Sequence, residues 1–210
     1  MEIKERILEK AEALFWKFGT RSITMDDISR DIGISKKTLY QHFVDKDDIV
    51  YQVILYRMDK NRENVSCHIS TAHDPIEEIL LGSEMLRQQL SDMNPALMID
   101  IQRHYPRAWE ICTEFKEKFI LESIRLNLRR GIEQGLYRSE IDVEIMARLR
   151  VELIRMAFDT DVFPKGLAAM IEVQIQLLHH FVRGILTEKG SIIYNQYVQK
   201  YQNVPASTTR

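Results

Sequence analysis

The chain has 210 residues, 45% of them hydrophobic and 29% charged, a balance that is ordinary for a water-soluble globular protein. Its formal net charge of −2 excludes an overall basic composition as a reason to expect nucleic-acid binding. The first fifty residues show no basic excess either, because they hold nine Lys and Arg against ten Asp and Glu. Any binding of nucleic acid must therefore depend on where the basic side chains lie.

The cysteines and the N-terminal sequence indicate a cytosolic protein. Cys67 and Cys112 are far apart and match neither a metal site nor a redox motif, so we expect two buried or half-buried thiols. The first fifteen residues are charged and amphipathic, without the apolar run of a signal peptide. No segment approaches the roughly 20 apolar residues that span a membrane. We expect a cytoplasmic, bacterial protein.

The first predicted helix covers residues 3–18. Its apolar residues recur at the spacing of one helix face, and Gly19 follows as a stop signal. The apolar stripe consists of Ile7, Ala11, Leu14, Phe15 and Phe18. This pattern predicts a packing helix that holds the next two helices at a fixed angle.

Residues 24–46 predict two short helices joined by a tight turn. Thr24 is a good N-cap, and Gly33 can end the first helix because glycine adopts the left-handed conformation at little cost. Ser35 then caps a second helix that runs to about Phe43. Its outer face is polar and basic, with Lys36, Lys37, Thr38, Tyr40, Gln41 and His42. Such an arrangement is typical of a helix-turn-helix, whose second helix enters the major groove of DNA.

The rest of the chain also shows helical periodicity, and no strand or internal repeat is evident. Further helices are expected over residues 45–67, 75–86, 94–101, 107–134, 143–158 and 167–186. Polar residues 68–74 predict a loop, and residues 202–210 predict a disordered tail. The predicted fold class is all-α.

One family resemblance is carried by the helix-turn-helix residues. The string Thr38-Leu39-Tyr40-x-His42-Phe43-x-x-Lys46-x-x-Ile49 resembles the recognition helix and following turn of the TetR (tetracycline-repressor-like) family. The flanking strings Phe18-Gly19, Ile23-Thr24-Met25-x-x-Ile28 and Gly33-Ile34-Ser35 also resemble it. The resemblance covers about the first fifty residues. It implies a three-helix DNA-binding domain at residues 1–48 and a helical ligand-binding and dimerisation bundle at residues 49–210.

The resemblance and contact chemistry together assign roles within the motif. Base contacts are expected from Lys36, Lys37 and Tyr40, because lysine donates to guanine and tyrosine contacts a base edge or a thymine methyl. Phosphate contacts are expected from Thr24, Thr38, His42 and Lys46. The alternative is that the lysines are merely a solvated face and Thr24 merely a cap. The adjacent lysines depart from the small residue often seen at the second position in the family, so the operator sequence stays open.

The resemblance also implies a small-molecule pocket in the body of the molecule. Candidate lining residues are Met85, Leu86, Met98, Ile101, Tyr105, Trp109, Phe115, Met146 and Phe158. The alternative is an ordinary core, because aromatic residues and Met at helical spacing commonly fill cores. The implied effector is small and apolar or amphipathic.

The last two long predicted helices have a broad apolar face. Its residues are Leu149, Leu153, Met156, Ile171, Ile175, Leu178, Phe181 and Val182. The resemblance implies that this face meets its twin in a homodimer, whereas periodicity alone is equally consistent with internal core. A separate argument favours a dimer, since one helix-turn-helix reads only half of a two-fold site.

No enzymatic motif emerges from the sequence. Adjacent His179 and His180 point to different faces of a helix, and no phosphate-binding glycine loop or nucleophile elbow is present. We expect no metal, no cofactor and no catalytic residues. The expected function is a transcriptional repressor that binds a near-palindromic double-stranded DNA operator and is released by its effector. One alternative is a ligand-independent architectural or protein-recruiting factor of the same fold, and a remote one is a small helical enzyme.

Overall fold

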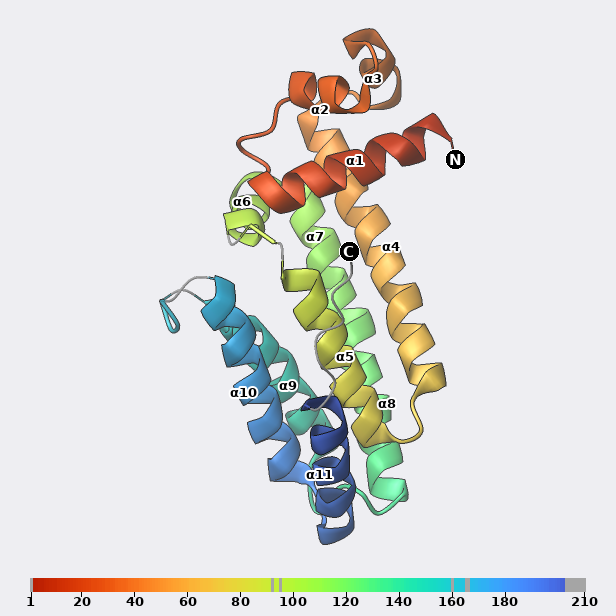
Figure 1. The fold of residues 1–210 in the computed structure, drawn as a ribbon, viewed down its shortest axis with the longest axis vertical. Coiled ribbons are helices and arrows are strands. Elements are labelled where there is room, and N and C mark those ends of the chain that lie inside the picture. The colour runs from red at the N-terminus through yellow and green to blue at the C-terminus, as the bar shows by residue number, and fades with distance from the viewer. Residues whose placement is uncertain (1, 92, 95, 160, 165–166, 203–210) are drawn as a thin grey trace. The chain divides into compact units, whose positions relative to one another are not determined.

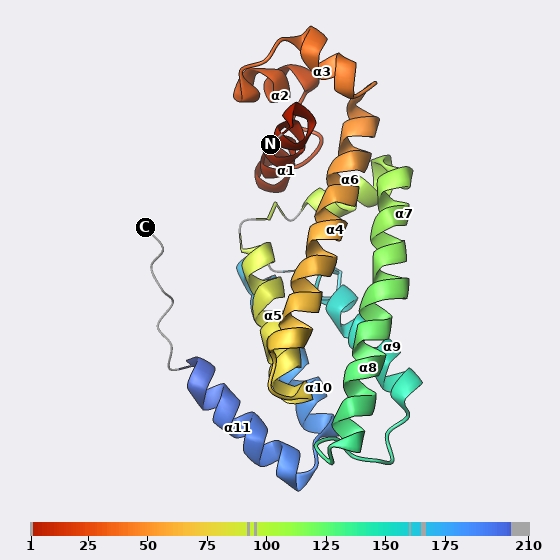
Figure 2. The same cartoon turned by 90° about the vertical axis from the view of Figure 1, so that its right-hand side faces the viewer.

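The computed structural model describes residues 2–91, 93–94, 96–159, 161–164 and 167–202, and these residues are almost entirely helical (Figures 1 and 2). Within these residues, an isolated antiparallel β-bridge joins Tyr137 to Leu186. The all-α prediction is confirmed. None of the helices in the described ranges is long and apolar enough to cross a membrane.

The chain forms two compact units, each built from two segments. Unit 1 comprises residues 1–65 and 88–119, and unit 2 comprises residues 66–87 and 120–210. The predicted division at residue 48 falls inside unit 1. The assignment of separate functions to residues 1–48 and 49–210 therefore stays a prediction.

Unit 1 begins with three helices, α1 (Ile3–Phe18), α2 (Met25–Ile32) and α3 (Lys36–His42). The predicted stripe of α1 is buried at Ile7, Ala11 and Phe15, whereas Phe18 is 47% exposed. Phe18 lies in the last turn of α1, immediately before Gly19, where the backbone turns away at a φ of 79°. Its prediction as an inward-facing residue was wrong.

The remaining part of unit 1 packs on these three helices, which are called the head below. It comprises the start of α4 (Lys46–Thr71), the end of α5 (Pro75–Leu90), α6 (Ala96–His104) and α7 (Pro106–Glu114). The Trp16 indole donates to the backbone oxygen of Gln89 at 3.0 Å, and the Asn94 N–H donates to the backbone oxygen of Trp16 at 2.7 Å. Arg107 adds an ion pair to Asp47 at 3.3 Å. Residues 88–119 are thus fixed to α1 and to the start of α4 by directional bonds.

Unit 2 contains most of α5, followed by α8 (Leu121–Glu133), α9 (Val143–Met156), α10 (Leu167–Ile185) and α11 (Glu188–Gln202). Helix α9 packs against both α8 and α10 (Figure 2). The buried core is Ile76, Leu121, Leu128, Leu136, Tyr137, Ala147, Val151, Leu178, Phe181, Val182, Ile185, Leu186 and Tyr194. Within this core the Tyr137 hydroxyl lies 2.9 Å from the oxygen of Pro75 and 3.1 Å from Asn127 Oδ1, so its polar end is satisfied.

Several predicted boundaries differ from the structure. Helix α4 continues to Thr71, so the predicted loop at residues 68–74 starts later than expected. The single helix expected over residues 107–134 contains a π-helical turn, η1 (Phe115–Ile120), between α7 and α8. Helix α11 was not predicted, and it extends to Gln202, the first residue of the expected tail at 202–210. Residues 203–210 of that tail lie outside the described residues, as does Pro95 at the expected start of α6.

Candidate nucleic-acid interface

The turn between α2 and α3 is built from local signals in the sequence. The Thr24 hydroxyl accepts a hydrogen bond from the Asp27 N–H at 3.2 Å, while Asp27 Oδ2 accepts from the Thr24 N–H at 3.0 Å. Gly33 ends α2 in the left-handed region at φ 76° and ψ 36°. The Ser35 hydroxyl then accepts from the Thr38 N–H at 3.0 Å and starts α3. These capping and stop predictions are confirmed.

Burial of one side of α3 leaves its other side to solvent. Leu39 is fully buried and Phe43 is 1% exposed, and Ile28 of α2 is fully buried as well. The two helices are therefore held through an apolar inner face. Lys36, Lys37, Tyr40 and Gln41 are exposed, Tyr40 by 52%. Such an outer face can reach base edges in a major groove without any change to the core.

The two predicted base-reading lysines differ in their surroundings. The Lys36 ammonium lies 2.5 Å from Asp26 Oδ2, which links α3 back to α2. Exposed pairs of this kind contribute about 0–1 kcal/mol, so Lys36 could exchange Asp26 for a guanine at little cost. Lys37 and Tyr40 are the freer candidates for base contacts.

The predicted phosphate-contacting residues all lie at or near the ends of α2, α3 and α4. The Thr24 hydroxyl also donates to Asp27 Oδ2 at 2.6 Å, and Thr38 Oγ1 lies 2.8 Å from Ser35 Oγ. His42 is half-buried beside Phe43. Burial lowers the pKa of Lys46, and the carboxylates of Asp100 and Asp27 oppose that shift. Thr24 is thus a cap, and its phosphate contact, like the other three, stays a prediction.

All three acidic side chains of α2 are paired with cations inside unit 1, which reduces their repulsion of a phosphate backbone. Asp27 Oδ1 lies 3.4 Å from the Arg30 guanidinium, and Asp31 Oδ2 lies 4.0 Å from the Lys10 ammonium. Together with the pair between Asp26 and Lys36, these contacts give each carboxylate of α2 a neighbouring cation.

The structure adds two exposed residues that sequence reasoning did not select. Gln41 lies beside Tyr40 on the outer face of α3, and an amide can read adenine through paired hydrogen bonds. Val44 follows α3 and is 80% exposed, so its methyl groups could contact a thymine methyl. The place of Gln41 on the polar outer face of α3 could have identified it as a base contact from the sequence. Nothing in the local pattern marks an apolar turn residue such as Val44 as exposed.

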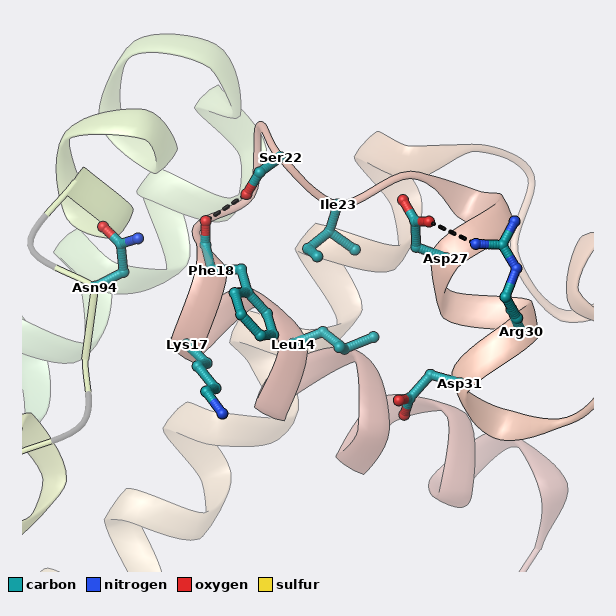
Figure 3. Close-up of a pocket in the computed structure, with 9 residues that line it drawn as sticks. All are labelled: Leu14, Lys17, Phe18, Ser22, Ile23, Asp27, Arg30, Asp31 and Asn94. Carbon is teal, nitrogen blue, oxygen red and sulfur yellow. Dashed lines mark hydrogen bonds and ion pairs between the residues drawn. The ribbon is translucent and has the colours of Figure 1, made fainter.

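Figure 3 shows a surface groove of about 790 Å³ in unit 1, beside α1 and α2. It is lined by Leu14, Lys17, Phe18, Ser22, Ile23, Asp27, Arg30, Asp31 and Asn94. Two of these side chains are cationic and two are anionic, with the Asp27–Arg30 contact on its wall. The mixed charge does not favour a phosphate, and none of the predicted pocket residues lines this groove.

The predicted pocket residues are divided between the two compact units. Met98, Ile101, Tyr105, Trp109 and Phe115 belong to unit 1, whereas Met85, Leu86, Met146 and Phe158 belong to unit 2. Ile101 is fully buried and Phe115 is 9% exposed. Burial raises the pKa of the Tyr105 phenol. A shared pocket of these residues stays a prediction.

The predicted dimer face is partly core. Leu178, Phe181 and Val182 are 2%, 4% and 0% exposed within the protomer, because α10 turns them into the core of unit 2. For these residues the interface prediction was wrong. Leu149 of α9 is 43% exposed, and its neighbour Ile145 is 60% exposed. The half-buried remainder of the predicted face is Leu153, Met156, Ile171 and Ile175.

The thiols and imidazoles show no metal geometry in the described ranges, where no cluster of three or more ligating side chains occurs. Cys112 is half-buried, and burial raises the pKa of its thiol to about 11. Cys67 is exposed, contrary to expectation, because α4 extends past it with that side facing solvent. His179 contacts the Tyr194 hydroxyl, and burial lowers the pKa of its imidazole.

Comparison with known proteins finds a family model that resembles the N-terminal part of the chain. Residues 7–53 match the model of bacterial regulatory proteins of the tetR family. An HTH-type transcriptional regulator of Staphylococcus aureus strain USA300 is 43% identical over 58 residues, which is 28% of this chain and 31% of the relative. The chain therefore matches about a third of the length of this curated relative.

Solved structures resemble nearly the whole fold at low sequence identity. A transcriptional regulator from Cytophaga hutchinsonii has a TM-score of 0.74 at 18% identity, covering 87% of this chain and 98% of that one. A putative transcriptional regulator from Saccharomonospora viridis, solved in complex with choline, has a TM-score of 0.72 at 20% identity, covering 88% and 98%. At these identities the likeness establishes the fold.

Proposed function

We propose that this chain, whose N-terminal domain belongs to the TetR family of bacterial regulatory proteins, is a cytoplasmic, homodimeric transcriptional repressor. The observation that carries the proposal is the α2–α3 geometry. Leu39 and Phe43 bury the inner face of α3, while Lys37, Tyr40 and Gln41 stand exposed on the outer face. A helix held in this way can enter the major groove as a rigid element.

A two-fold operator follows from the small number of bases that one recognition helix can contact. One α3 presents only a few side chains to base edges, and this suffices for a half-site. Specific affinity at physiological salt requires a second head at a fixed spacing. The accessible apolar residues Ile145 and Leu149 of α9 support a partner surface in unit 2.

Release by an effector is the regulatory part of the proposal. An effector lowers operator affinity only if it binds the DNA-incompetent arrangement more tightly than the competent one. The Saccharomonospora structure holds choline, which supports a small organic molecule as the ligand of a chain with this fold. No catalytic step is part of the proposed function.

The test is a selection of genomic fragments with the purified protein, followed by a salt titration of the best site. We expect one two-fold-related sequence, bound with an affinity that falls steeply as salt rises, because phosphate contacts release counterions. Weak binding that ignores sequence would favour a ligand-independent architectural factor. Absence of DNA binding would overturn the proposed function.

A further inference from the structure

Helix α9 carries an arginine on the face that it turns into unit 2. Arg150 is 7% exposed and shares this face with Ala147 and Val151, which are 0% and 6% exposed. Its Nη1 has no hydrogen-bond partner among the described residues. Burial alone lowers the pKa of this guanidinium, to about 10, so the side chain stays charged at neutral pH. A buried cation without a counter-ion is costly, and a protein retains one rarely without a use for it.

Helix α10 brings an unpaired acceptor to the next turn of α9. Gln174 is 5% exposed, and its Nε2 donates to the backbone oxygen of Ile154 at 2.6 Å. Ile154 lies one helical turn beyond Arg150 on α9, so Gln174 Nε2 contacts the turn of α9 next to the one that carries Arg150. Gln174 Oε1 accepts no hydrogen bond from the described residues. Of three buried unpaired side-chain atoms in the described part of the chain, two are therefore located where α9 meets α10.

The carboxylates of these two helices are engaged elsewhere. Glu144 binds Arg125 at 2.7 Å and Arg148 at 2.6 Å. Glu152 binds Arg155 at 2.6 Å, and Glu172 accepts a hydrogen bond from Gln176 at 2.8 Å. Neither α9 nor α10 thus supplies the missing partner of Arg150.

We propose that the junction of α9 and α10 binds the carboxylate of a small organic acid, with Arg150 as its ionic partner and Gln174 Oε1 accepting a hydrogen bond from a hydroxyl or N–H group of the same molecule. The inference rests on the proposed function, since this acid would be the effector. A guanidinium matches the two oxygens of a carboxylate. One cation balances one carboxylate, whereas a phosphate would bring nearly two charges. The apolar neighbours Ala147 and Val151 favour an acid with a hydrocarbon body.

The test uses the full chain without DNA. Linear alkanoates that carry a terminal hydroxyl, from glycolate to hydroxydodecanoate, each with its matched diol as the alcohol, are titrated by calorimetry and by thermal unfolding. We expect at least one alkanoate to bind and raise the unfolding temperature, while its alcohol does not. Arg150→Gln should weaken that binding about tenfold or more. Arg148→Gln is the matched control, because Arg148 is exposed on the same helix and should leave binding unchanged.

A second variant supplies the carboxylate from the protein itself in place of the ligand. Gln174→Glu supplies a carboxylate beside Arg150, so it should stabilise the ligand-free protein and abolish alkanoate binding. Gln174→Leu, which supplies no charge, should not stabilise it. Circular dichroism confirms that each variant is folded.

Three results would overturn the inference: no alkanoate binds better than its alcohol, Arg150→Gln binds like the wild type, or Gln174→Glu still binds the acid. Operator binding is measured separately. If the protein binds an operator but no alkanoate, this inference fails and the proposed function stands. If it binds an alkanoate but no DNA, the site stands and its role as an effector site fails.

Discussion

The outer face of α3 combines flexible cations with one rigid aromatic ring. Tyr40 is 52% exposed although it lies next to the fully buried Leu39. Its ring cannot contribute much to the core, because its neighbours on the helix already fill the inner face. Its place on the outer face of α3 leaves the ring accessible to a base edge or a thymine methyl.

Tyr40→Ala should therefore weaken operator binding by about 1–3 kcal/mol without changing the fold, because a base or thymine-methyl contact is lost. Fluorescence anisotropy with the selected operator gives the affinity, and thermal unfolding gives the stability. Ile192→Ala is the control, since Ile192 is 62% exposed on α11, far along the chain from the motif. Unchanged operator affinity in Tyr40→Ala would contradict the assignment of the recognition helix.

Gly131 shows how one residue fixes the packing of unit 2. A Cβ atom built on Gly131 would overlap the ring of Tyr137, which is 1% exposed and hydrogen-bonded at its hydroxyl. Neither the ring nor the helix can move freely to relieve this overlap. The glycine in α8 is thus required by a close approach and not by its backbone angles.

Gly131→Ala should lower the free energy of unfolding by about 1–3 kcal/mol or more, because it overpacks a filled core. Gly82→Ala is the matched substitution within helix α5, where an added Cβ meets no atom within 4 Å. It should raise stability by up to about 1 kcal/mol through helix propensity. Urea unfolding monitored by circular dichroism measures both. Equal effects of the two alanines would show that the Tyr137 ring is not fixed.

At the scale of elements, Glu144 joins α8 to α9. Its carboxylate binds the Arg125 guanidinium through two contacts of 2.7 and 2.8 Å, and it also accepts from Arg148 of its own helix. These hydrogen bonds, that of Arg125 first, lower the pKa of Glu144 from 4.5 to about 2. Because the folded protein releases this proton more readily than the unfolded chain, the pair stabilises the fold above the unfolded pKa.

This stabilisation should be lost as the pH falls from about 4.5 to about 2, where Glu144 becomes protonated in the folded state. Glu144→Gln should flatten the dependence of unfolding free energy on pH in that window. The group is exposed, so solvent keeps the effect small. Glu140→Gln, which removes a longer contact of 3.6 Å to Arg138, is the control. Equal pH profiles for wild type and Glu144→Gln would refute the assigned role.

Elements marked by local signals could be predicted from the sequence. Thr24, Gly33 and Ser35 each act within a few residues of themselves, so cap and turn chemistry located α2 and α3. The attachment of residues 88–119 to the head had no such signal. It depends on two hydrogen bonds that join Trp16 to Gln89 and Asn94, and the acceptor in both is a backbone oxygen that any sequence supplies.

Periodicity also could not distinguish internal core from an interface. Leu178, Phe181 and Val182 have the helical spacing that either role requires, and only the packing of α10 shows that they are core. Helix α11 escaped prediction for a related reason. Its Gly190 resembles a break in the pattern, yet that glycine lets the helix approach the backbone oxygen of Leu136. A close tertiary contact, invisible in sequence, explains the residue.

At the scale of the whole molecule, the proposed function depends on a second copy of the chain. The head holds one α3, and one recognition helix contacts too few bases for specific binding at physiological salt. Unit 2 offers the apolar residues Ile145 and Leu149 on α9, which are 60% and 43% exposed. Their exposure is costly for an isolated chain and useful for a dimer.

Leu149→Asp should therefore separate the dimer, because association would bury an unpaired carboxylate. We expect a monomer in analytical ultracentrifugation, an unfolding midpoint close to that of the wild-type monomer, and operator affinity lowered about a hundredfold or more. Ile192→Asp is the control for adding one exposed carboxylate, since Ile192 lies on α11 outside the predicted interface. If Leu149→Asp stays dimeric and binds the operator normally, the dimer uses another surface. If it becomes monomeric yet binds the full operator as tightly as before, the proposal that two recognition helices bind one operator is wrong.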